Sequence, residues 1–304
     1  MPKFPRLALL AALLMTTSAY AADGAPVARS GLIKTFDDEF DRFSWFAEGD
    51  TPTKGGGTWR TNFGAKWCPV DDIKNHSLIW NHEKEVYVDP GFRGSSPQSL
   101  NLNPFSVSGG VLHITANRTD NPALGGYQFT SGLISSEPSF AQTYGLFEMR
   151  ARLPAGRGYW PAFWLMPADK SWPPEIDIME ILGHEPGKLY TTLHTKETGK
   201  HTKSDIPPHD IPDSSADYHT YALDWGPQEM VFYFDDKEIA RRPTPADMNK
   251  PFYILINLAV GGDWPGNPDA ATPLPGTMDV DWVRVWQRPD YIAASSKPSG
   301  IVAR

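Results

Sequence analysis

The close spacing of proline and glycine most constrains the fold, because it interrupts the chain before a long helix could form. The 304 residues include 29 prolines and 26 glycines, and the apolar runs between them are short. Residues 146–153 alternate apolar and charged side chains, with Phe147, Met149 and Ala151 on one face, as in a half-buried strand. Beyond the first 22 residues no long stretch has a helical period. The sequence therefore predicts an all-β sandwich or barrel of many short strands.

Further strands and one hairpin support this fold class. Residues 111–116, 252–260 and 279–287 have the composition of strands. Two more strand-like runs flank Asp235 and Asp236, which predicts a hairpin with these two residues in its turn. We expect one β-sandwich domain over residues 30–289. A flexible tail is expected at 290–304.

The first 22 residues have the pattern of a secretory signal peptide. Lys3 and Arg6 precede an apolar run at residues 7–15, and Ala19-Tyr20-Ala21 offers small residues for cleavage. A membrane anchor is the alternative, but the run is too short to span ~30 Å of hydrocarbon at ~1.5 Å per residue. We therefore expect a secreted or periplasmic protein with no membrane association after cleavage.

Charge and cysteine content argue against several classes of function. The net charge is −8 and no run of Lys and Arg occurs, so nucleic acid and anionic membranes are poor partners. Cys68 is the only cysteine, so no intrachain disulfide can form. Eleven tryptophans, several of them beside Gly or Pro, offer flat apolar faces suited to stacking on sugar rings, although most would serve core packing. We expect a monomer.

The stretch PPEIDIME carries the strongest chemical signal, because it holds three carboxylates. In a strand, residues i and i+2 share a face, so Glu175 and Asp177 point the same way. Strict alternation would send Glu180 to the opposite face. A β-bulge in which Ile178 and Met179 together oppose one partner residue would return it. The sequence therefore predicts three acids on one surface.

Carboxylates on one face repel each other unless some hold protons, so their pKa values should separate. Hydrolysis of a glycosidic bond uses such a division between an ionised nucleophile and a protonated acid. A solvent-facing acidic strand edge is the alternative from the stretch alone. The surroundings favour catalysis: Trp160 and Trp164 share a face if extended, His194 lies in a later strand-like run, and Trp264 lies on a Gly/Pro loop.

The order of these segments resembles glycoside hydrolase family 16. GYWPAFWLM, PPEIDIME, LHT, NLAVGGDWPG and VDWVRVW follow one another between Phe36 and Trp286. The resemblance implies a β-jelly-roll sandwich of the concanavalin A-like lectin and glucanase type, with a sugar-binding cleft across its concave sheet. It also implies a retaining endo-β-glycosidase that cleaves β-1,3 or mixed β-1,3/1,4-linked glucan, or a related bacterial exopolysaccharide.

The resemblance further implies a role for each acid. Glu175 resembles the family nucleophile, Glu180 the acid/base, and Asp177 the assisting acid between them. Met179 resembles an extra residue that laminarinases, agarases and carrageenases have and that lichenases and xyloglucan-active members generally lack. Leu133, in TSGLISS, departs from the family pattern, because many laminarinases have Arg there.

Candidate ligands of the substrate also follow from the resemblance. They are Asn81, Glu83, Trp160, Trp164, His194 and Trp264. No cofactor is implied, although some members bind a structural calcium ion near the chain ends.

Two alternatives remain open at this point. A glycosyl-enzyme intermediate can be intercepted by a sugar hydroxyl, which would make the protein a transglycosylase. A non-catalytic glycan-binding sandwich is the other hypothesis.

The substrate is expected to be neutral or weakly charged, because the candidate cleft segments hold only one cation, Lys84, and a sulfated glycan would need cationic partners.

Overall fold

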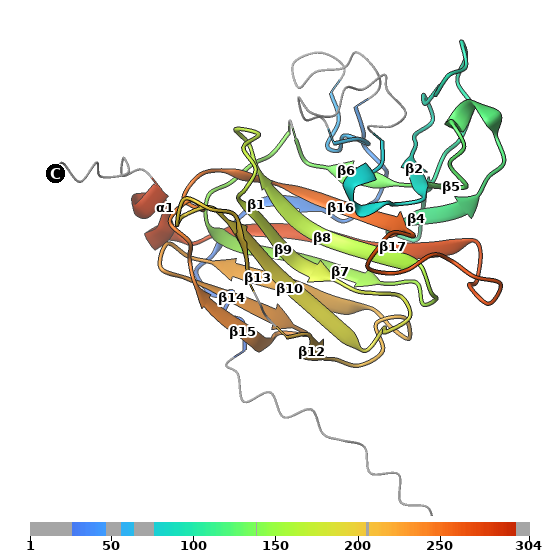
Figure 1. The fold of residues 1–304 in the computed structure, drawn as a ribbon. Helices are drawn as coiled ribbons and strands as arrows, with labels where there is room; N and C mark the ends of the chain where they lie inside the picture. The colour runs from blue at the N-terminus through green and yellow to red at the C-terminus, as the bar shows by residue number, and fades with distance from the viewer. Residues whose placement is uncertain (1–25, 47–55, 64–75, 138, 205–206, 296–304) are drawn as a thin grey trace, which may run out of the picture.

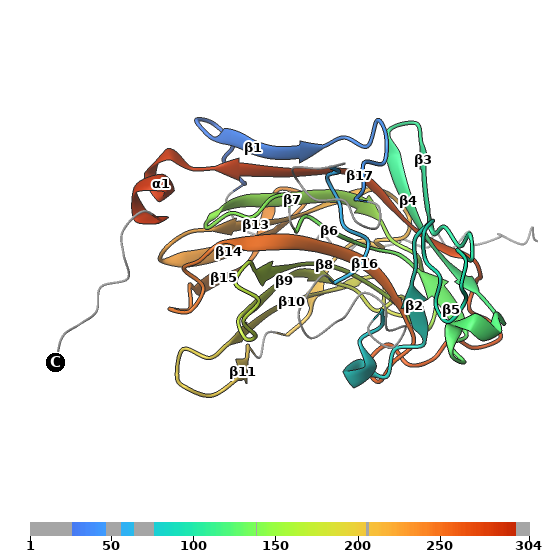
Figure 2. The same ribbon diagram turned by 90° about the horizontal axis from the view of Figure 1, so that it is seen from above.

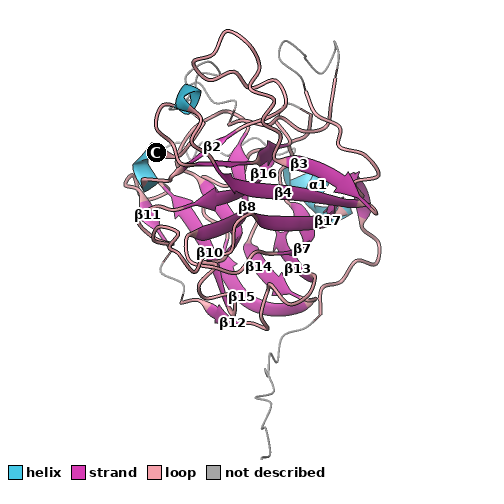
Figure 3. Ribbon diagram, turned by 90° about the vertical axis from the view of Figure 1, so that its right-hand side faces the viewer, coloured by secondary structure: helices cyan, strands magenta, loops and turns pink. Residues whose placement is uncertain are grey.

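The computed structural model describes residues 26–46, 56–63, 76–137, 139–204 and 207–295. Two β-sheets pack face to face in this part of the chain (Figures 1 and 2), which confirms the predicted all-β sandwich. Strands supply nearly all of the regular structure, and the helices are short segments outside the two sheets (Figure 3). The predicted signal peptide and Cys68 lie outside the described residues.

The outer sheet has the strand order β15-β14-β13-β7-β17-β4-β5-β2, with β1 added to β17 and β3 to β4. Its ten strands are β1 (Ile33–Asp38), β2 (Glu85–Tyr87), β3 (Phe105–Ser108), β4 (Val111–Arg118), β5 (Phe129–Ser131), β7 (Gly145–Arg152), β13 (His219–Trp225), β14 (Glu229–Phe234), β15 (Lys237–Pro243) and β17 (Gly276–Gln287). All of its strand pairs are antiparallel except β2 with β5.

The inner sheet has the order β11-β10-β9-β8-β16-β6, with β12 added to β10. Its seven strands are β6 (Leu133–Ser135), β8 (Tyr159–Pro167), β9 (Glu175–Glu180), β10 (Lys188–Thr195), β11 (Thr202–Lys203), β12 (His209–Asp210) and β16 (Phe252–Val260). The described helices are two 3-10 turns, η2 (Ile79–Asn81) and η3 (Pro122–Leu124), and α1 (Pro289–Ser295). None of the described helices is long and apolar enough to cross a membrane.

The main core lies between the two sheets. Strand β16 is buried along its whole length, as its uninterrupted apolar run predicted. The predicted hairpin is also confirmed: β14 pairs with β15, and Asp235 and Asp236 both have positive φ. Positive φ at both central residues is typical of the type I′ turn, which suits the twist of a hairpin.

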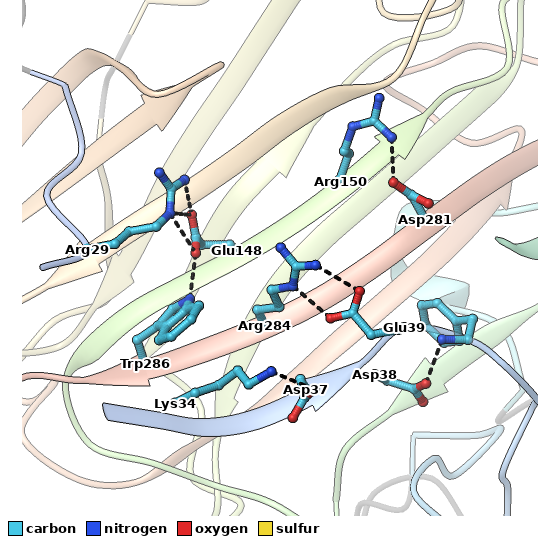
Figure 4. Close-up of polar contacts among 11 residues, drawn as sticks. Arg29, Lys34, Asp37, Asp38, Glu39, Glu148, Arg150, Asp281, Arg284 and Trp286 are labelled. Atoms are coloured by element: carbon cyan, nitrogen blue, oxygen red, sulfur yellow. Dashed lines mark hydrogen bonds and ion pairs between the residues drawn. The ribbon is translucent and has the colours of Figure 1, made fainter. Parts of the chain in front are cut away.

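Strand β7 departs from its predicted half-exposed pattern. Glu148 was expected on the solvent face, but its side chain is only 1% exposed. Figure 4 shows why: Arg29 and Trp286 cover it, with Arg29 Nε and Trp286 Nε1 donating to its carboxylate at 3.0 and 2.7 Å. A segment from the N-terminal end of the described chain therefore closes over the outer sheet at this point.

The predicted tail is wrong in its first part. Residues 290–295 were expected to be flexible, but they form most of helix α1. Tyr291 packs against the main core, and its ring meets that of Tyr144 edge to face at 6.2 Å between centroids. Tyr291 thus anchors the helix to the core. A helix of seven residues is too short to show a helical period in the sequence. Residues 296–304 lie outside the described part.

Candidate active site

Strand β8 divides its side chains between the core and the opposite face of the inner sheet. Phe163 and Leu165 lie in the core between the sheets. Trp160, Ala162 and Trp164 point to the other face and line an open cavity. This is the period-2 alternation of a strand, so the prediction that Trp160 and Trp164 share a face is confirmed.

Strand β9 carries the predicted bulge. On β8, Phe163 pairs with Met179 and Trp164 pairs with Asp177, so the register skips Ile178. Strand β10 shows the same shift, because Tyr190 pairs with Glu180 and Thr192 with Asp177. The side chains of Ile178 and Met179 both enter the core. The extra residue therefore returns Glu180 to the face of the other two acids.

The cavity has a volume of about 730 Å³ and lies across the inner sheet. Strands β8, β9, β10, β11 and β16 form its floor, and the segments around η2 and after β16 form one end. Its lining includes every candidate site residue predicted from the sequence: Asn81, Glu83, Trp160, Trp164, Glu175, Asp177, Glu180, His194 and Trp264. The tertiary structure thus gathers segments that are more than 180 residues apart in the chain.

Asp177 is the member of the triad that resists ionisation most. Burial raises its pKa well above the usual range, and the charges of Glu175 and Glu180 raise it further. The Asp177 carboxyl also hydrogen-bonds with Glu175, which favours the ionised form of Glu175. Both effects favour the protonated form of Asp177, which donates a hydrogen bond to the Glu175 carboxylate.

Glu175 has a second donor that favours its charge. The pKa of this carboxyl is raised by burial, but Trp172 Nε1 donates to its Oε2 at 2.5 Å and opposes that effect. Two donors to one carboxylate, one from Trp172 and one from Asp177, fix its orientation as well as its charge.

Glu180 titrates near neutral pH. Burial raises its pKa to about 7, while the positive charge of Lys203 lowers it and the charge of Glu175 raises it. Trp160 Nε1 donates to Glu180 Oε1 at 3.1 Å, and the hydroxyl of Thr192 donates to Oε2 at 3.4 Å. A carboxyl with this pKa can both give and take a proton at neutral pH.

His194 lies beside the acids as a neutral imidazole. Its Nε2 is 3.5 Å from Asp177 Oδ2, and its Nδ1 is 3.0 Å from His201 Nε2. Burial, with the charges of Lys203 and His201, lowers the pKa of His194 to about 4. The ring therefore contributes hydrogen bonding rather than charge at neutral pH.

Trp164 and Trp264 occupy different surroundings. Trp164 is buried, and its Nε1 donates to Asn257 Oδ1 at 2.8 Å. Trp264 is partly exposed on the segment after β16, where its ring meets Trp160 at 5.2 Å and Tyr190 at 4.8 Å in edge-to-face geometry. Trp264 therefore presents an aromatic wall to the cavity, and Trp164 lies in its floor.

Asn81 and Glu83 lie at one end of the cavity. Asn81 Nδ2 donates to Glu83 Oε1 at 3.0 Å, so the two predicted ligands are joined to each other. Leu133, which stands where many laminarinases have Arg, is buried next to Trp164 in a small apolar cluster. Its strand, β6, pairs with β16 at Asn257.

Four polar or aromatic residues that line the cavity were not among the candidates predicted from the sequence: Trp80, Trp172, Lys203 and Asn257. Trp80 is 82% exposed at the end formed by η2, and Trp172 is 50% exposed at the edge near His194. Asn257 accepts a hydrogen bond from Trp164 Nε1 and donates one from Nδ2 to the Tyr87 hydroxyl. The position of Trp172 beside PPEIDIME was an available signal, whereas nothing in the sequence indicates that Lys203 enters the cavity.

Lys203 lines the cavity, although Lys84 was the only cation expected in the candidate cleft segments. Residue 203 pairs with His194 in the β10–β11 ladder, and its Nζ lies 5.3 Å from the centroid of the Trp264 ring. Lys84 is not among the residues that line the cavity. The cavity therefore holds a positive charge at its rim, supplied by a segment that the sequence reasoning did not place there.

Glu175, Asp177 and His194 form the only group of three possible metal ligands within the described ranges, with their ligand atoms within 4.8 Å of one another. All three already have hydrogen-bonding partners in the cavity. Near the C-terminal end, Asp279 accepts from Arg152 Nη2 at 2.6 Å and Asp281 accepts from Arg150. Calcium binding by this protein stays a prediction.

The sequence and the fold are similar to those of known carbohydrate-active proteins. Residues 101–284 match the sequence profile described as glycosyl hydrolases family 16. The chain is 41% identical over 271 residues to the endo-1,3-1,4-beta-glycanase ExsH of Rhizobium meliloti (strain 1021), covering 88% of this chain and 52% of that protein. It is 36% identical over 258 residues to a beta-glucanase of Rhodothermus marinus, covering 71% of this chain and 87% of that one.

Among solved structures, the laminarinase catalytic domain of Thermotoga maritima MSB8 superposes with a TM-score of 0.66 at 28% identity. The match covers 85% of this chain and 99% of that domain. The present chain spans about half the length of the Rhizobium meliloti glycanase, so the likeness to that protein concerns one of its parts.

Proposed function

Because the chain belongs to glycosyl hydrolases family 16, we propose that it is a retaining endo-β-glycosidase acting on β-1,3 or mixed β-1,3/1,4-linked glucan or a related bacterial exopolysaccharide. The observation that carries the proposal is the bulge in β9, which gathers three acids of different protonation on the floor of one cavity. Two relatives are named endo-1,3-1,4-beta-glycanase and beta-glucanase, which supports the choice of substrate.

In the first step, Glu175 is the nucleophile. Its carboxylate forms a bond to the anomeric carbon as the bond from that carbon to the leaving oxygen breaks. Glu180 gives its proton to the leaving oxygen, for which a pKa of about 7 suits it. Asp177, held neutral between them, donates to Glu175 and prevents a third negative charge from opposing the reaction.

In the second step, the roles of Glu180 reverse. Its carboxylate removes a proton from a water molecule, whose oxygen attacks the anomeric carbon and releases Glu175. Two displacements at one carbon restore the original configuration, so the first product is the β-anomer. Trp160, which donates to Glu180, supports the ionised form that this step requires.

Aromatic side chains along the cavity suit binding of the glycan chain. Trp80 and Trp172 are exposed in the lining, and Trp264 forms a wall beside Trp160. Flat apolar faces of this kind stack on sugar rings, and an open cavity with several aromatic residues suits internal cleavage of a long chain. This supports the endo mode.

One panel of glycans tests the proposal. Purified protein and the Glu180→Gln variant are incubated with laminarin, mixed-linkage glucan, a bacterial β-glucan exopolysaccharide and carrageenan. We expect reducing-end release from at least one glucan, early products of intermediate length by chromatography, and initial β-anomer by proton NMR, all absent from the variant. Binding of a glucan by the folded wild-type protein without any release would instead support the non-catalytic reading, and transfer products at high sugar concentration would support transglycosylation.

A further inference from the structure

A second pair of carboxyl groups, Glu83 and Glu85, lies at the end of the cavity formed by η2. Glu85 is the first residue of β2 and Glu83 lies two residues before it, and the two carboxyls hydrogen-bond to each other. Glu83 lines the cavity and is 5% exposed, whereas Glu85 lies behind it and is fully buried. No Lys or Arg in the described ranges forms an ion pair with either group.

The hydrogen bonds around the two groups differ. Glu83 accepts from Asn81 Nδ2 at 3.0 Å, from the Leu78 N–H at 3.2 Å and from the Tyr87 hydroxyl at 3.4 Å. Glu85 Oε2 accepts from the Val260 N–H at 2.7 Å. Asn81, Leu78 and Tyr87 stabilise negative charge on Glu83, whereas Glu85 has two backbone donors, the Val260 N–H and its own N–H, and shares the Tyr87 hydroxyl with Glu83. A single proton shared by the pair therefore belongs on Glu85.

Burial and mutual repulsion act in the same direction. Burial raises the pKa of both carboxyls, and the charge of Glu83 raises that of Glu85 well above its usual range. The titratable groups that act on Glu85 are Glu83 and Tyr87. Its neighbours on the packed strands, Phe129 on β5 and Val260 on β16, carry no charge.

Glu85 also lies where two segments of the cavity wall, residues 81–85 and 260–263, contact each other. The Lys84 N–H donates to the Val260 carbonyl at 2.8 Å, and the Asp263 N–H donates to the Asn81 carbonyl at 2.9 Å. Gly262 has φ of 117°, and a Cβ there would lie 2.8 Å from the Asn81 carbonyl oxygen. The segment that holds Asn81 and Glu83 is therefore fixed against the segment that holds Trp264.

We propose that Glu85 is a positioning residue which, as a neutral acid, keeps Glu83 ionised and directed into the cavity, where Glu83 accepts hydrogen bonds from glycan hydroxyls. The inference rests on the proposed function for its substrate, a β-glucan. Its charge assignment concerns the protein alone. Glu85 touches no substrate, so its effect is on binding of the glycan and not on the bond-breaking steps at Glu175 and Glu180.

The charge assignment is tested without any glycan. Protein labelled with carbon-13 at the glutamate side-chain carboxyl is titrated by NMR, and the two signals are assigned from the Glu83→Gln and Glu85→Gln variants. We expect the Glu85 carboxyl to remain protonated at pH 7 and the Glu83 carboxyl to be ionised. Ionised Glu85 at pH 7, or the reverse distribution of the proton, overturns the proposal whatever the enzyme acts on.

The effect on binding is tested with a soluble glucan from the panel above. For Glu85→Leu we expect KM to rise about tenfold with kcat within about twofold of wild type, because one charged acceptor is lost or misplaced. Glu85→Gln keeps a neutral donor, so its KM at pH 6 should stay within about twofold. The wild-type KM should rise at alkaline pH as Glu85 ionises, because its pKa is raised well above the usual range, and that rise should be absent in Glu85→Gln.

Glu238→Gln, on the exposed hairpin strand β15, is the matched control and should leave both constants unchanged. Equal losses in Glu85→Gln and Glu85→Leu would overturn the proposal, because a neutral partner would then not suffice. A fall in kcat with unchanged KM would overturn it as well. If the wild-type protein cleaves no glucan, the proposed function fails, while the NMR titration still decides the charge of the pair.

Discussion

Replacing Trp160 by phenylalanine is expected to move the alkaline limb of the pH profile upward. Trp160 Nε1 donates to Glu180 Oε1 at 3.1 Å, and this hydrogen bond favours the ionised form of Glu180 and lowers its pKa. Phenylalanine keeps most of the aromatic surface but has no donor. Glu180 would therefore hold its proton to a higher pH, and a general acid is active only while it is protonated.

The size of the shift follows from the strength of the lost hydrogen bond. A hydrogen bond to a charged group contributes about 1.5–3 kcal/mol, and about 1.4 kcal/mol corresponds to one pKa unit. Trp160 is only partly buried, and Thr192 still donates to the other oxygen of Glu180, so the lower end applies. We expect the alkaline limb, near pH 7 in the wild-type protein, to move up by about one unit.

The assay is kcat/KM for glucan hydrolysis between pH 4 and pH 10. Trp164→Phe is the matched control, because Trp164 donates to Asn257 and not to an acid. Its profile should change in height but not in the position of the alkaline limb. An equal shift in both variants, or a downward shift in Trp160→Phe, would refute the account of how Glu180 is tuned.

Four further outcomes are expected. Glu180→Gln should reduce turnover at least 100-fold in a protein that melts like the wild type, and a loss of only a few-fold would remove the acid/base assignment. Deletion of Met179 should leave Ile178 opposite Phe163 and all three acids on one face, so in turnover assays it should retain far more activity than Glu180→Gln. Lys203→Met should move both limbs of the pH profile upward, because Lys203 lowers the pKa of Glu175 and of Glu180, and 0.5 M salt should shrink the difference between the two proteins. Glu148→Ala should lower the free energy of unfolding in urea by about 2 kcal/mol, since Trp286 Nε1 loses its acceptor and Arg29 loses one of its two carboxylate partners, and a change below about 1 kcal/mol would show that the network on the outer sheet adds little.

The sequence by itself determined the strands and the common face of the acids. Alternation at β8, the apolar run of β16 and the paired aspartates of the β14–β15 turn are local properties, set by the two-residue period of a strand and by the φ values that a tight turn requires. The bulge in β9 was predictable for the same reason. Because one extra residue separates Asp177 from Glu180, a β-bulge is needed to return Glu180 to the face of Asp177 within the strand.

Only the tertiary structure decided which partners each side chain has. Lys203 enters the cavity because β11 adds to the edge of β10, Glu148 is buried because a distant arginine and tryptophan cover it, and Glu85 meets Val260 across 175 residues of chain. These contacts set the charges of the acids. The pKa of a carboxyl depends on burial and on donors that come from other strands, and no local pattern of residues records which strands those are.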